Sequence, residues 1–273
     1  MKYFTSSDGI RLAYRDEGTG LPLICLAGLT RNSRDFDYLA PHLTGVRLIR
    51  PDYRGRGASG RADYRSYTPP VEARDVLELM DHLGLERAAF LGTSRGGMIA
   101  MILAVTAKVR LLGVCLNDIG PEIAPEGLAT IMSYLGRRPA PKTYAAAAQA
   151  RAEFMTGFQG VALSRWEEEV RKHYIETDDG LDLTYDAKLR QAVEEAGAQP
   201  APDLWPLFDA FAGVPLALIR GANSDLLSRE TAQEMRARRP DMLFADVPGR
   251  GHVPFLDEPE SLEIIHSYLG KLR

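Results

Sequence analysis

The sequence predicts an α/β fold in which a mainly parallel sheet is covered by helices and carries an inserted helical cap. Strand-like and helix-like patterns alternate through residues 1–120 and again through residues 204–273. Residues 121–203 are instead helix-like and poor in strand patterns. Because parallel strands are joined by helical crossovers, the alternation favours a doubly covered sheet. We therefore expect a core of residues 1–120 and 204–273, and a cap of residues 121–203 over the carboxyl ends of the strands.

Each expected element has its own pattern. Residues 10–14 alternate apolar and polar side chains, as an edge strand does. Apolar runs indicate strands covered on both faces at 22–27, 88–91 and 111–116, and shorter or later strands are expected at 46–50, 214–219 and 243–247. Helical spacing predicts a core helix over 72–83. The apolar run at 98–104 is expected to be a buried helix, further core helices are expected over 229–238 and 259–269, and helix-like segments of the cap lie around 144–148, 166–170 and 189–196.

Composition is that of an ordinary globular protein. A net charge of −4 gives no sign of nucleic-acid binding, and no apolar run reaches the roughly 18 residues of a membrane span. Cys25 and Cys115 both lie in expected strands, where buried free thiols are favoured over a disulfide, and the N-terminus shows no secretory pattern. We expect a cytoplasmic protein with a small-molecule substrate and neither a nucleic-acid nor a membrane partner. A homo-oligomer is left open.

The most informative segment is 92–97, Gly-Thr-Ser-Arg-Gly-Gly. It joins the strand at 88–91 to the helix around 98–104. Glycines two residues before and two residues after Ser94 match the G-x-S-x-G turn, which presents a serine above the end of a strand. Only glycine would let the strand and the helix pass so closely. Ser94 is therefore the candidate covalent nucleophile.

A serine nucleophile needs a base and an acid that orients the base. Of the five histidines, only His252 follows a strand within a glycine-rich turn, so it is the candidate base. Asp225 is the preferred acid, because turn residues after the strand at 214–219 present it at a strand end. Asp118 is the alternative acid, since its loop can also approach the histidine. As a structural residue, Asp118 would simply cap or form a turn.

The oxyanion of an acyl-transfer reaction needs two backbone donors. The amides of Arg95 and Leu29 are the candidates, although Leu29 could also be no more than a pocket wall. Residues 55–60 match G-x-G-x-x-G, but no helix pattern follows them, so a turn is predicted there and not a dinucleotide site. Neither C-x-x-C nor H-E-x-x-H occurs, so no metal and no cofactor are expected.

Together these features resemble the α/β-hydrolase superfamily over essentially the whole chain. The resemblance rests on the turn at 92–96, on residues 51–59, which look like the D-x-R-G-x-G-x-S signature, on Asp225 and on residues 251–252. It implies a sheet of about eight strands, with the cap entering after the sixth. Two positions depart from the family pattern. Ala27 stands where many members have histidine, and Arg95 where many have an apolar residue or glutamine.

A serine nucleophile disfavours the haloalkane dehalogenases and epoxide hydrolases of this superfamily, which use aspartate. Esterases, lactonases, carbon–carbon bond hydrolases and acyl transfer to peroxide remain. We expect hydrolysis of a small carboxylic ester or lactone through an acyl-enzyme on Ser94. The alternatives are a carbon–carbon bond hydrolase, or a ligand receptor built on the same scaffold.

The substrate is not identified by the sequence. Large cap side chains are expected to be core residues in the first instance, although any of them could line a pocket; they are Met132, Phe154, Phe158 and Trp166. Several arginines, including Arg31 and Arg34, could bind an acidic substrate, but most arginines are solvated.

Overall fold

The sheet has eight strands in the order β1-β2-β4-β3-β5-β6-β9-β10, in a computed structural model that describes all 273 residues. β1 and β2 pair antiparallel, as do β2 and β4, and the remaining pairs are parallel. The predicted mainly parallel, eight-stranded sheet is confirmed. Its strands are β1 (Lys2–Thr5), β2 (Arg11–Gly18), β3 (Leu21–Leu26), β4 (Val46–Pro51), β5 (Ala88–Thr93), β6 (Leu111–Asn117), β9 (Leu216–Gly221) and β10 (Leu243–Val247).

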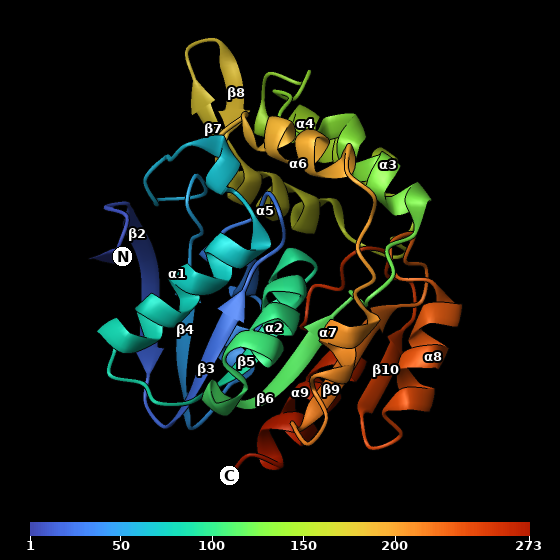
Figure 1. Cartoon of the computed structure of the whole chain (residues 1–273). Coiled ribbons are helices and arrows are strands. Elements are labelled where there is room, and N and C mark those ends of the chain that lie inside the picture. Colours follow the sequence, from blue (N-terminus) through green and yellow to red (C-terminus); the bar gives the residue numbers. More distant parts are fainter.

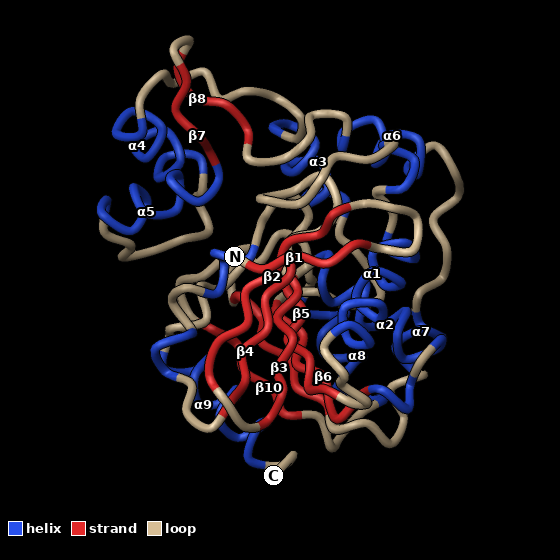
Figure 2. The backbone as a smooth tube through the Cα atoms, turned by 90° about the vertical axis from the view of Figure 1, so that its left-hand side faces the viewer, coloured by secondary structure: helices blue, strands red, loops and turns tan.

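Helices cover both faces of this sheet (Figures 1 and 2). One face is covered by α1 (Pro69–His82), α2 (Arg95–Thr106), α7 (Trp205–Asp209) and α8 (Arg229–Arg238). The other face is covered mainly by α9 (Pro259–Gly270). No helix is both long and apolar enough to cross a membrane.

Alternate side chains of the central strands enter the two cores. In β3, Ile24 and Leu26 belong to the core under α1 and α2, whereas Leu23 and Cys25 belong to the core under α9. This alternation follows from the two-residue period of a strand, and it explains why a strand buried on both faces is apolar throughout. The thiols of Cys25 and Cys115 are buried and free.

Residues 121–203, here called the cap, lie above the carboxyl ends of the parallel strands (Figure 1). They form α3 (Pro125–Tyr134), α4 (Tyr144–Phe154), α5 (Leu163–His173) and α6 (Leu189–Gly197). They also form a hairpin of β7 (Tyr174–Thr177) and β8 (Gly180–Leu183), which the sequence patterns did not predict. Each hairpin strand has only four residues, too few to establish a period, so only the glycine at its turn marks it.

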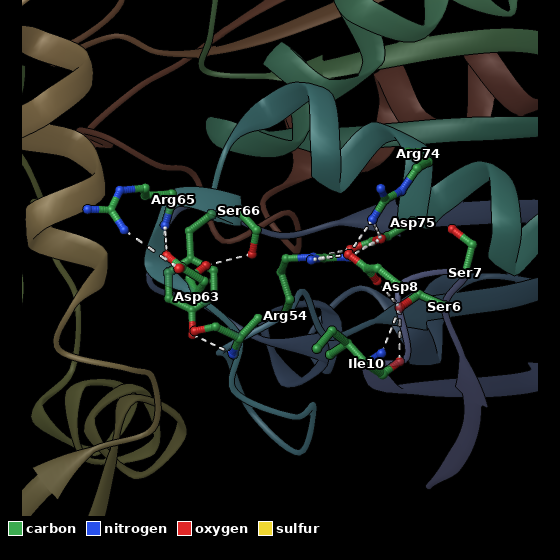
Figure 3. A network of polar contacts seen from close by, with 12 residues as sticks. Ser6, Ser7, Asp8, Ile10, Arg54, Asp63, Arg65, Ser66, Arg74 and Asp75 are labelled. Atoms are coloured by element: carbon green, nitrogen blue, oxygen red, sulfur yellow. Dashed lines mark hydrogen bonds and ion pairs between the residues drawn. The ribbon is translucent and has the colours of Figure 1, made fainter.

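The loop after β4 is held by ionic contacts of Arg54 (Figure 3). The Arg54 guanidinium lies 2.6 Å from the Asp75 carboxylate of α1 and 2.9 Å from the Asp8 carboxylate of the β1–β2 turn. The hydrogen bond from Arg54 lowers the pKa of Asp8, and burial raises the pKa of Asp75. Arg54 is almost completely buried, so both carboxylates compensate its charge. This part of the 51–59 segment therefore joins the edge of the sheet to α1.

The glycines of the same loop make a turn, as predicted from the missing helix pattern. Gly55 and Gly57 both have positive φ, at 71° and 54°. A Cβ atom on Gly57 would overlap the carboxylate of Asp52, which accepts hydrogen bonds from the amides of Ser33 and Ala58. No helix begins at these glycines, so the G-x-G-x-x-G match has no nucleotide-binding geometry.

Candidate active site

Ser94 sits on the sharp turn between β5 and α2. Its backbone has a φ of 50°, a conformation that residues other than glycine rarely adopt. A Cβ atom on Gly92 would lie 2.6 Å from the backbone of Gly96, and one on Gly96 would overlap the carbonyl oxygen of Leu26. Both flanking glycines are therefore required for the close passage of strand and helix. Such a strained residue at a strand end is typical of a functional site.

A row of hydrogen bonds runs from Ser94 through His252 to Asp118. The Nε2 atom of His252 lies 3.0 Å from the hydroxyl oxygen of Ser94. Its Nδ1 atom lies 2.7 Å from a carboxylate oxygen of Asp118. Because a carboxylate only accepts hydrogen bonds, Nδ1 carries the proton and Nε2 is left to accept the proton of Ser94. The arrangement can activate the serine for attack on an acyl carbon.

The prediction that Asp225 is the acid is wrong, because Asp225 does not contact His252 in the structure. Asp225 is exposed and forms neither a hydrogen bond nor an ion pair with His252. The alternative, Asp118, is completely buried and holds the imidazole. Like Ser94, it adopts a positive φ, of 54°.

Strand order explains this correction. β6 lies directly beside β5, whereas β9 is one strand further away. Asp118 follows the last residue of β6 and is therefore next to the turn that carries Ser94. The end of β9 and the loop after it instead support Asp118: the Gly221 amide donates to one carboxylate oxygen at 2.8 Å, and the Ser224 hydroxyl donates to the other at 2.6 Å. Sequence reasoning missed Ser224, and its position directly before Asp225 was the only available signal.

The side chain of Arg95 points away from the reacting groups and into a buried ionic cluster. Its Nε atom lies 2.7 Å from Glu72, which also lies 2.9 Å from Arg56 of the loop after β4. Arg95 further donates to the carbonyl oxygen of Tyr67 at 2.9 Å. The unusual residue after Ser94 therefore joins the turn to α1, and its backbone amide stays available.

The expected oxyanion donors are both free of protein acceptors. The Leu29 amide donates to no backbone carbonyl, and Leu29 lines the cavity beside Ser94. Arg95 is the first residue of α2, and the first amides of a helix have no acceptor within it. The positive end of the helix dipole lies at this position and favours a negative charge there.

A cavity of about 320 Å³ opens onto Ser94 and His252. Its walls come from the loop 28–31 and from the cap, and 10 of its 18 lining residues are hydrophobic. Phe154 is one of them, contrary to its expected place in the core. Of the other large cap residues, Trp166 is buried in a cap core, and Met132 and Phe158 pack against cap cores. The volume suits a small molecule.

One wall of the cavity adjoins a buried cluster of charges. Arg31 lies 2.7 Å from Asp35 and 3.5 Å from Glu169, and Lys172 lies 3.1 Å from Glu169. Burial raises the pKa of Asp35. Burial alone would raise the pKa of Glu169, but the surrounding cations lower it. Burial also lowers the pKa of His173, so that imidazole is neutral.

Asp35, Glu169 and His173 bring one ligand atom each to within 4.8 Å of one another. The arrangement does not suit a metal ion, because Arg31 and Lys172 already neutralise both carboxylates and would repel a further cation.

Comparison with known proteins places the chain in a family. Residues 23–263 match the family model described as the alpha/beta hydrolase family. The chain belongs to this family. Its fold is also that of an alpha/beta hydrolase from Novosphingobium aromaticivorans, with a TM-score of 0.92, 39% identity, and 99% of this chain and 97% of that one covered.

Two curated relatives cover nearly the full length of this hydrolase. A 3-hydroxybutyrate-oligomer hydrolase from Cupriavidus necator is 36% identical over 268 residues, which are 93% of this chain and 91% of that protein. Esterase YbfF from Escherichia coli is 25% identical over 259 residues, 91% of this chain and 93% of that protein. The chain is thus a hydrolase with esterase and oligomer-hydrolase relatives.

Proposed function

We propose that this hydrolase cleaves small carboxylic esters through an acyl-enzyme on Ser94, with His252 as the base and Asp118 as the orienting acid. The observation that carries the proposal is the pair of hydrogen bonds of His252, at 3.0 Å to Ser94 and 2.7 Å to Asp118. The serine hydroxyl, the imidazole in contact with it and the buried carboxylate together supply the nucleophile, the base and the acid of a serine hydrolase site.

The steps follow from this geometry. His252 takes the proton of Ser94 through Nε2 while the serine oxygen bonds to the acyl carbon. The amides of Leu29 and Arg95 stabilise the oxyanion. The carbon–oxygen bond to the alcohol then breaks, and the alcohol leaves with the proton held by His252. Water, deprotonated by His252, attacks the acyl-enzyme, and the carboxylic acid leaves while Ser94 regains its proton.

Among ester substrates, short oligomers of a hydroxy acid are the first candidates. The relative from Cupriavidus necator is named for 3-hydroxybutyrate oligomers, whose units are joined by ester bonds. The second relative is named an esterase. Both names favour ester hydrolysis over carbon–carbon bond cleavage and over a receptor role. The cytoplasmic location and the expected absence of nucleic-acid and membrane partners stay predictions.

The proposal is tested with p-nitrophenyl butyrate and the linear dimer of 3-hydroxybutyrate. We expect Ser94→Ala to lower kcat on the order of 10⁴-fold or more, because the covalent route is lost. Ser133→Ala is the matched control, since this serine is exposed on the cap. Hydrolysis that survives in Ser94→Ala would exclude the acyl-enzyme, and a wild type inactive on both esters would refute the proposed function.

A further inference from the structure

Arg151 is a cavity-lining arginine with no partner. It belongs to the last turn of α4 and lines the same cavity as Ser94 and His252. Its guanidinium makes no salt bridge, and its Nε atom is buried without any hydrogen-bond acceptor. Arg31, on the wall of the same cavity, is by contrast paired with Asp35 at 2.7 Å. Buried donors are normally satisfied, so an orphaned guanidinium at a cavity indicates a missing acceptor.

The charges around Arg151 do not balance. Arg31, which also lines the cavity, is paired with Asp35, and Lys172 behind it is paired with Glu169, whereas Arg151 forms no ion pair. Both carboxylates are occupied by the other two cations. The positive charge of Arg151 is therefore left unpaired beside the cavity, where it suits an anionic group of a bound molecule.

The remaining surroundings of Arg151 fit the carboxylate of an otherwise apolar molecule. Tyr134 and Tyr174 line the cavity with it and bring phenol groups that can donate hydrogen bonds. Hydrophobic side chains such as Ile131 and Phe154 make up much of the remaining wall.

We propose that Arg151 binds a free carboxylate of the substrate while Ser94 attacks an ester bond of the same molecule. The inference rests on the proposed function and narrows it to esters that carry a carboxylate group. A planar guanidinium can bind a carboxylate through two parallel hydrogen bonds, which selects this group over a neutral amide or ester. Arg151 is thus a specificity-determining residue of the cavity.

The experiment compares the linear dimer of 3-hydroxybutyrate with the same dimer whose carboxylate is converted to a primary amide. The ratio of kcat/KM for the acid to kcat/KM for the amide is measured in the wild type and in Arg151→Met. We expect this ratio to fall about 10- to 100-fold, or about 1.4–2.7 kcal/mol at 1.36 kcal/mol per tenfold change. Arg151→Lys, which keeps the charge, should restore part of the preference. Arg137→Met removes an exposed cap arginine and should leave the ratio unchanged.

Calorimetric binding of both dimers to Ser94→Ala, with and without Arg151→Met, separates this inference from the proposed function. Tighter binding of the acid that disappears with Arg151 supports the carboxylate site, even if the wild type hydrolyses no ester. Equal binding of acid and amide, no binding of the acid, or a preference that survives Arg151→Met would overturn it. Ester hydrolysis that depends on Ser94 would then still support the proposed function.

Discussion

Replacement of Asp118 by asparagine is the sharpest test of the site, because it preserves shape and changes only the hydrogen-bonding pattern. The Asp118 carboxylate accepts three hydrogen bonds, from His252 at 2.7 Å, Ser224 at 2.6 Å and the Gly221 amide at 2.8 Å. All three partners donate, and an asparagine amide offers only one accepting oxygen.

The consequence depends on which way the amide turns. With its NH₂ group toward Gly221, two donors face each other within a completely buried site. With its NH₂ group toward His252, the imidazole must accept at Nδ1, so Nε2 holds the proton and cannot take the proton of Ser94. The second orientation gives the wrong tautomer, which in serine proteases costs about 10⁴-fold in kcat. We therefore expect Asp118→Asn to lower kcat about 10³- to 10⁴-fold, equivalent to about 4–5.5 kcal/mol.

The assay is hydrolysis of p-nitrophenyl butyrate, with Asp225→Asn as the isosteric control. Because Asp225 is exposed and does not contact His252, we expect its variant to stay within about threefold of the wild type. Urea unfolding of both variants shows whether a loss of activity reflects loss of the fold. A large loss in Asp225→Asn together with an active Asp118→Asn would refute the assignment of the acid.

Two further predictions concern the support of the Ser94 turn. Gly96→Ala should greatly lower both stability and activity, because the added Cβ atom would overlap a carbonyl oxygen of β3; a variant with wild-type kcat and urea midpoint would contradict the packing argument. Glu72→Gln should lower the free energy of unfolding by about 3–5 kcal/mol, because it leaves Arg56 and Arg95 without their carboxylate. The control Asp81→Asn removes an exposed ion pair and should cost less than about 1 kcal/mol. Equal urea midpoints for these two variants would show that the buried cluster contributes little.

Much of the fold was predictable because its signals are local. The strand over 243–247 and the helix over 229–238 have the predicted bounds, because a short apolar run and helical spacing are both features of contiguous residues. β1 was not predicted, because only Phe4 of its four residues is buried and no period develops. The β7–β8 hairpin was too short for the same reason.

The sequence by itself predicted the turn around Ser94 and identified His252 as the candidate base. Glycines at fixed spacing and one histidine in a glycine-rich turn are features of contiguous residues, so they can be recognised without the fold. Only the tertiary structure decided between Asp118 and Asp225, because both follow strands of the sheet and the decision depends on which strand lies beside β5. It also decided that Arg151 is orphaned at the cavity wall, since the partners of a side chain come from segments far apart in the chain. Local structure follows from neighbours in sequence, whereas the acid and the substrate-facing charge depend on how distant segments pack.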